Sequence, residues 1–83
     1  MMKYHNLMAE FVASLAKLTP SQFAVQRETI CEVIEEERSE TNLTFLERQL
    51  AVVDICGEYI HGSKKYADAR ANLHKMRLQE HGD

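Results

Sequence analysis

The chain has 83 residues, enough for one small domain whose core alone gives only marginal stability. With 45% hydrophobic and 28% charged residues it has the composition of a folded globular protein, and its formal net charge of −3 opposes binding to nucleic acid. One proline and three glycines leave few breaks, which favours long helices over many short strands. We therefore expect a single helical domain over residues 1–83.

Two amphipathic helices are predicted in the first half of the chain. The first spans residues 3–18, where the apolar residues that share one face are Tyr4, Leu7, Met8, Phe11, Val12, Leu15 and Leu18. The second spans residues 20–38, because Thr19 suits the N-cap, Pro20 the first helical position and Gln22 a capping box.

The third predicted helix, residues 42–61, is apolar around more than half of its circumference. Two lines of apolar residues run along it: Leu46, Leu50, Val53 and Ile60 in the first, and Phe45, Val52, Cys56 and Tyr59 in the second. Such a helix must be covered from at least two sides, so we expect it at the centre of the fold. Its N-cap is expected at Thr44 or Thr41, and Gly62 is expected to end it in the left-handed conformation.

A fourth helix is predicted over residues 63–80, with a thinner apolar line formed by Tyr66, Ala69, Leu73 and Met76. Because the connections are short, neighbouring helices should pack roughly antiparallel. The predicted fold class is therefore all-α. The expected architecture is a small four-helix bundle, or three helices with a projecting C-terminal helix.

Four glutamates of the second predicted helix share one face and form an acidic ridge: Glu28, Glu32, Glu35 and Glu36. The ridge is either a solvated helix face or a surface that binds a basic partner protein. Glu37 continues the apolar line of the same helix, so either the core ends there or the position faces another chain. Weak apolar stripes at Ile55 and at Leu78 suggest more apolar surface than one monomer covers, and hence a homo-oligomer or a stable partner.

The fourth predicted helix carries a basic stripe of Arg70, His74 and Arg77. One interpretation is that the stripe contacts the phosphates of a nucleic acid, which is our alternative class of function. Pairing with the acidic ridge, within one chain or across a dimer, explains the stripe as well. A helix-turn-helix built from the second and third helices is excluded because the acidic segment EEER would face the phosphates.

A second alternative is a carboxylate metal site at Asp54, Glu58 and His61, which follow one another at i, i+4 and i+7. Glu58 and His61 also have the Glu-x-x-His spacing of di-iron bundles. Such a site needs further inward-facing carboxylates from other helices. The competing interpretation is an exposed acid and a histidine near a helix C-terminus, where the helix dipole favours a cation.

The two cysteines, Cys31 and Cys56, are flanked by apolar residues and have no CxxC spacing, so we expect reduced and inert thiols. The sequence has no nucleophile elbow, P-loop or dinucleotide fingerprint. It therefore predicts neither an enzyme nor a bound cofactor. The start, MMKYHNLMAEF, lacks the apolar segment of a signal peptide, and no run approaches the ~18 apolar residues of a membrane span, so we expect a cytoplasmic protein.

In size, acidity and helix content over its whole length, the chain resembles the short acidic helical proteins of bacteriophages, such as antirepressors and other inhibitors that bind a host or phage regulator. The resemblance includes no diagnostic motif, so it implies no site residue. It implies a protein partner, such as a DNA-binding repressor that is removed from its operator by protein contact, in the cytoplasm of a bacterial host. The expected function is therefore a protein–protein interaction module that acts as a regulator or inhibitor.

Overall fold

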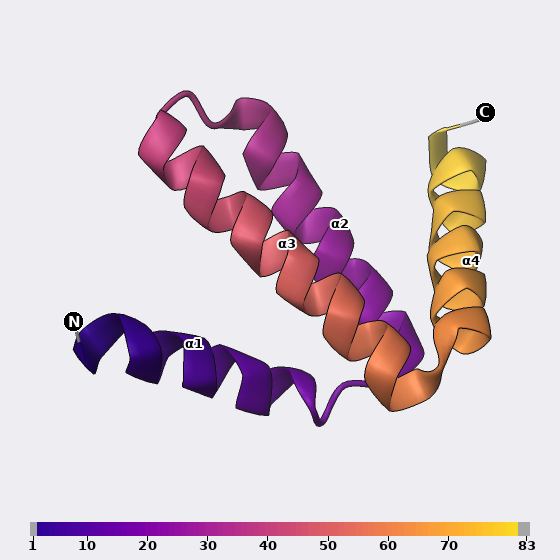
Figure 1. The fold of residues 1–83 in the computed structure, drawn as a ribbon. Helices are drawn as coiled ribbons and strands as arrows, with labels where there is room; N and C mark the ends of the chain where they lie inside the picture. Colours follow the sequence, from indigo (N-terminus) through magenta and orange to yellow (C-terminus); the bar gives the residue numbers. More distant parts are fainter. Residues whose placement is uncertain (1, 82–83) are drawn as a thin grey trace.

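The computed structural model describes residues 2–81 of the chain and the side chains of residues 8–80. These residues form four α-helices and no strand: α1 (Met2–Leu15), α2 (Pro20–Glu36), α3 (Glu40–His61) and α4 (Ser63–His81). Figure 1 shows α2 and α3 side by side as an antiparallel hairpin, with α1 on one side and α4 on the other. The predicted all-α class is thus confirmed. None of the described helices combines the length and the apolarity needed to cross a bilayer.

The start of α2 follows the prediction closely. The Thr19 side chain accepts a hydrogen bond from the backbone N–H of Gln22 (3.2 Å), and the Gln22 side chain accepts one from the backbone N–H of Thr19 (2.9 Å). Because Thr19 precedes a proline, its backbone is extended and cannot continue a helix. α1 ends at Leu15 rather than at the predicted residue 18. The chain leaves it through two tighter bonds, from the N–H of Lys17 to the carbonyl of Ser14 and from the N–H of Leu18 to the carbonyl of Leu15.

The turn from α2 to α3 has the predicted length of three residues but lies two residues earlier, at 37–39 instead of 39–41, and the expected N-cap at Thr44 or Thr41 is wrong. Ser39 is the N-cap, and its hydroxyl accepts from the backbone N–H of Asn42. The Glu37 carboxylate accepts from the backbone N–H groups of Arg38 and Ser39, both at 3.1 Å. These bonds satisfy the amide groups of the turn, so α3 begins at once, at Glu40.

Gly62 is the single residue between α3 and α4. Its N–H donates to the carbonyl of Glu58 at the end of α3, and its carbonyl accepts from the N–H of Tyr66 in α4. The predicted positive φ is confirmed at 90°, although ψ is 148° rather than the value of a left-handed helix. This region of backbone space is essentially restricted to glycine, which lets the chain change direction in one residue.

A small core lies where the helices meet, and its buried side chains are Leu15, Phe23, Ile30, Val53 and Tyr66. Phe23 and Tyr66 pack edge to face, with ring centroids 6.1 Å apart. The aromatic pair joins α2 to α4, and Val53 of α3 is fully buried beside the same cluster. The core therefore contains side chains from every helix.

The prediction that α3 is covered along both of its apolar lines holds only in part. Val53 is buried, but Ile60 of the same line is 41% exposed, and Tyr59 of the second line is 90% exposed. Met76, predicted on the apolar line of the fourth helix, is 57% exposed. The reason is geometric, because α1 is short and α4 stands at an angle to the hairpin, as Figure 1 shows. Apolar periodicity is present at these positions, but no neighbouring helix lies over them.

Candidate functional site

Two regions of the molecule carry side chains that could serve a function: the α2–α4 side, which gathers the charged groups, and the outer face of α3, which gathers exposed apolar groups. The charged region is anchored by Asp54, whose Oδ1 atom accepts two hydrogen bonds. Arg27 donates from Nε at 2.9 Å, and the Tyr66 hydroxyl donates at 2.5 Å. The three residues lie on α2, α3 and α4, so one half-buried carboxylate links three helices.

The structure does not bring the proposed metal ligands together. Asp54 is directed to Arg27 and Tyr66, whereas His61 Nε2 lies 2.7 Å from the backbone carbonyl oxygen of Leu18. Because a carbonyl oxygen only accepts, this ring nitrogen must carry a hydrogen. Among the described residues no group of three His, Cys, Asp or Glu side chains could hold a metal ion. The i, i+4, i+7 spacing therefore does not produce a metal site here.

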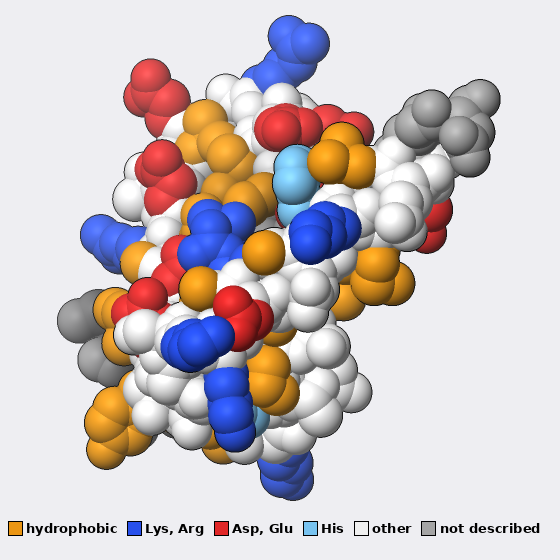
Figure 2. All heavy atoms as spheres, turned by 90° about the vertical axis from the view of Figure 1, so that its right-hand side faces the viewer, with side chains coloured by type: hydrophobic (Ala, Val, Ile, Leu, Met, Phe, Trp, Pro, Cys, Tyr) orange, Lys and Arg blue, Asp and Glu red, His pale blue; other side chains and the backbone are white. Residues whose placement is uncertain are grey.

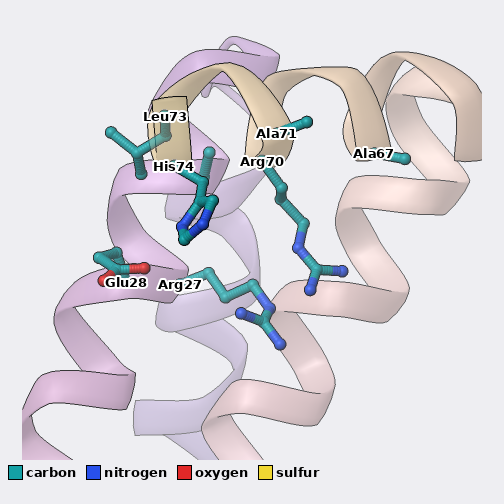
Figure 3. Close-up of a pocket in the computed structure, with 8 residues that line it drawn as sticks. Arg27, Glu28, Ala67, Arg70, Ala71, Leu73 and His74 are labelled. Atoms are coloured by element: carbon teal, nitrogen blue, oxygen red, sulfur yellow. The ribbon is translucent and has the colours of Figure 1, made fainter. Parts of the chain in front are cut away.

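The basic stripe of α4 faces the acidic ridge of α2, as the pairing interpretation requires. Arg70, His74, Arg27 and Glu28 line one groove of about 380 Å³. Figure 3 shows His74 on the side of Glu28, whereas Arg70 extends toward Arg27 and away from Glu28. Arg77 of α4 lies 3.8 Å from the Glu32 carboxylate. Exposed pairs of this kind contribute little to stability, typically about 0–1 kcal/mol, but they neutralise one another's charge.

This groove is already balanced in charge. Arg27 pairs with Asp54, and the Arg70 guanidinium lies 5.7 Å from the centre of the Tyr66 ring. Glu28 supplies a carboxylate within the lining itself. Figure 2 looks onto the α4 side and shows acidic and basic side chains interspersed over it, without a continuous basic field. Such a surface does not favour a phosphate backbone over other ligands.

The two remaining glutamates of the acidic ridge, Glu35 and Glu36, have different surroundings from the neighbouring Glu37. Glu35 and Glu36 are exposed, and among the described residues neither takes part in an ion pair. Glu37 instead belongs to the turn, where hydrogen bonds from the Ser39 backbone and the Asn42 side chain hold the pKa of its carboxyl below the ordinary value. Of the two interpretations of Glu37, the structure supports the one in which the core ends there.

The outer face of α3 carries an apolar strip, which we define as Phe45, Val52, Ile55 and Tyr59. At 100° per residue these positions fall within about 80° of arc on the helix. Ile55 is 67% exposed and Tyr59 is 90% exposed, whereas Val52 is partly covered. Toward the start of α3 the strip adjoins a hollow of about 320 Å³ that is lined by Phe45 and by Met8 and Phe11 of α1. The strip is therefore an apolar surface continuous with the edge of α1.

Sequence reasoning identified only Ile55 of this strip as exposed. It placed Phe45, Val52 and Tyr59 on a core line, because periodicity shows which residues share a face but not whether another helix covers it.

Leu78, the other predicted apolar contact, is 58% exposed on α4, far along that helix from the buried Tyr66. The sequence did not predict that Arg27 would pair with Asp54 in the charged region. Both cysteines are free thiols of intermediate exposure, in line with the expected reduced state.

No protein-family model matches the chain, and searches of curated proteins and of solved structures find no significant match either.

Proposed function

We propose that this chain is a non-enzymatic protein–protein interaction module that acts as a small regulator or inhibitor. The observation that carries the proposal is the apolar strip, in which Ile55 and Tyr59 are 67% and 90% exposed. Large apolar side chains scattered singly over a surface are ordinary, but several of them side by side on one helix face are typical of a binding surface. Tyrosine in particular is enriched in protein interfaces, since its ring packs while its hydroxyl remains hydrogen-bonded.

The acidic residues that α4 leaves unpaired support a partner with a basic surface. Glu28 and Glu32 face the basic stripe, whereas Glu35 and Glu36 at the end of α2 are open to a second protein. Charges at the rim of an interface speed association and select among partners more than they add affinity. A DNA-binding repressor is the partner class we propose, because its DNA-binding face is basic, and the site of action would then be a bacterial cytoplasm.

The test compares variants that alter one surface at a time. Ile55→Glu places a charge on the apolar strip, and Glu35→Lys with Glu36→Lys reverses the exposed acidic charge. Val25→Glu is the matched control, because Val25 is 46% exposed on α2, on the side opposite its core-facing residues. Glutamate and lysine are both good helix formers, so circular dichroism should show the same helix content in all variants.

We expect the tagged chain to capture one stoichiometric partner from its host, and the complex to re-form from the two purified proteins. Ile55→Glu and the Glu35→Lys/Glu36→Lys variant should weaken that complex, and Val25→Glu should not. Failure to re-form any complex from purified components would overturn the proposal. So would a complex that is indifferent to both the strip and the acidic variants.

A further inference from the structure

The molecule is elongated for a folded domain of its length. Its principal extents are 47 × 31 × 15 Å. The radius of gyration is 13.9 Å, whereas a compact domain of this length would have about 11.8 Å. The chain is therefore less compact than a single packed domain of its length.

The exposed area shows how much surface is left uncovered. The accessible surface is 6520 Å², while a compact monomer of 9.6 kDa would expose about 5,100 Å². The difference of about 1,400 Å² exceeds the roughly 800 Å² that each partner buries in a standard protein interface. A surface of this size is enough for a stable dimer.

We propose that the apolar strip is covered by a second copy of this chain, in a two-fold symmetric contact between antiparallel α3 helices. The spacing of the strip carries the inference. Phe45 and Tyr59 lie seven residues before and seven residues after Val52. In an antiparallel contact centred on Val52, each Phe45 therefore meets the partner's Tyr59, and the two helices cross at Val52, whose side chain packs partly against the core of its own chain. A surface that is its own complement in this way is what a two-fold dimer requires.

The polar neighbours of the strip agree with this register. Arg48 is exposed between Phe45 and Val52, and in the antiparallel contact it lies beside the ring of the partner's Tyr59, where a cation–π contact is favourable. Seven-residue spacing of apolar positions is also the repeat that packs two helices at a shallow angle over a long contact.

This inference deepens the proposed function and rests on its assignment of the strip as a protein-binding surface. The protein that covers the strip is a second copy, and Glu35 and Glu36 contact the regulator. Ile55→Glu then weakens the complex with the regulator by breaking the dimer that presents these acidic residues. Because the two-fold axis duplicates them, the dimer presents two acidic sites. A repressor that is itself a two-fold dimer has the symmetry to contact both.

The first experiment measures the mass of the purified full-length chain by sedimentation equilibrium over a wide range of concentrations. We expect twice the 9.6 kDa chain mass. Tyr59→Lys should weaken the dimer at least about 100-fold, since its ammonium group would be buried next to the partner's Arg48. Tyr59 is almost fully exposed in the monomer, so this change leaves the core intact. Val25→Glu and Leu78→Glu, at exposed positions outside the strip, should leave the dimer unchanged.

The second experiment tests the register. Combining Phe45→Glu with Tyr59→Lys places opposite charges against each other twice across the axis, so the double variant should recover the dimer that Tyr59→Lys loses. The control pair, Leu78→Glu with Tyr59→Lys, should not recover it. A wild-type chain that stays monomeric at every concentration overturns the inference, even if it still binds a regulator. A dimer unaffected by Tyr59→Lys and Ile55→Glu overturns it as well, and failure of the charge pair to restore association overturns the register.

Discussion

The ring of Tyr66 lies directly against the backbone of Gly57, so that a Cβ atom at position 57 would be 2.6 Å from Cε1 of Tyr66. No real Cβ comes that close to another carbon, so the absence of a side chain at Gly57 is what lets α4 approach α3. The approach brings the Tyr66 hydroxyl within 2.5 Å of Asp54 on α3. One glycine thus determines both the packing of α4 and the central polar contact.

We predict that Gly57→Ala destabilises the protein, although helix propensity alone predicts the opposite. Alanine in place of a helical glycine gains about 1 kcal/mol, while overpacking a buried site costs about 1–3 kcal/mol. A net loss on the order of 1 kcal/mol is expected from urea denaturation at neutral pH. In a Tyr66→Leu background, where the ring is gone, the same change should become stabilising. Stabilisation by Gly57→Ala in the wild-type chain would show that the ring moves aside freely.

A second prediction concerns the hydroxyl of Tyr66, whose pKa is raised above its ordinary value by burial and by the adjacent Asp54 carboxylate. Tyr66→Phe keeps the ring but removes the hydrogen bond, so it should cost about 1 kcal/mol at neutral pH. The folded state holds this proton more tightly than the unfolded chain does. The stabilising contribution is therefore complete below the unfolded pKa of about 10 and declines as the pH rises above it.

The measurement is the free energy of unfolding of both proteins in urea at several pH values between about 7 and 11. The wild-type advantage over Tyr66→Phe should be constant up to about pH 9 and should shrink above about pH 10. A difference that stays constant through pH 11 would contradict a raised pKa at Tyr66.

The number of helices and one of their junctions were predictable because the signals are local. Thr19, Pro20 and Gln22 specify a helix start through bonds between residues three positions apart, and the structure shows those bonds. The cap of α3 was missed because several capping residues follow one another from Ser39 to Thr44. The Glu37 carboxylate favours Ser39 as the cap, because it accepts hydrogen bonds from the backbone N–H groups of Arg38 and Ser39.

The sites were harder to predict because they depend on contacts between distant residues. Asp54 resembled a surface acid or a metal ligand, and only the path of α4 reveals that Tyr66 and Arg27 share it. A signal did exist, since a tyrosine on an apolar line needs a partner for its hydroxyl. For the apolar strip there was no such signal. Tyr59 has the same periodicity as a core residue, and its exposure follows from where α1 ends.

A third prediction separates backbone strain from crowding at the second structurally important glycine. Gly62 has φ of 90°, but a Cβ atom there would meet nothing within 4 Å. Gly62→Ala should therefore lose about 1–3 kcal/mol through backbone strain alone. Because no neighbouring side chain is involved, Tyr66→Leu should not relieve this loss. The same change should relieve the loss caused by Gly57→Ala. Thermal unfolding of the single and double variants checks both statements, and an unchanged melting temperature in Gly62→Ala would contradict the strained corner.

The last prediction concerns the nucleic-acid alternative. Arg70 lies over the Tyr66 ring, Arg77 lies near Glu32, and the chain carries a net charge of −3, so the basic stripe has little charge to offer to phosphates. We expect the isolated protein to bind a short DNA duplex no more tightly than the roughly 10⁻⁴ M of weak non-specific binding.

Three phosphate contacts would instead give a slope of about −2.7 in log K against log salt. A slope near that value in fluorescence anisotropy, lost in an Arg70→Ala/Arg77→Ala variant, would establish the stripe as a DNA-binding surface. If binding stays weak and the slope stays near zero in both proteins, the charges of α4 serve the contact with α2.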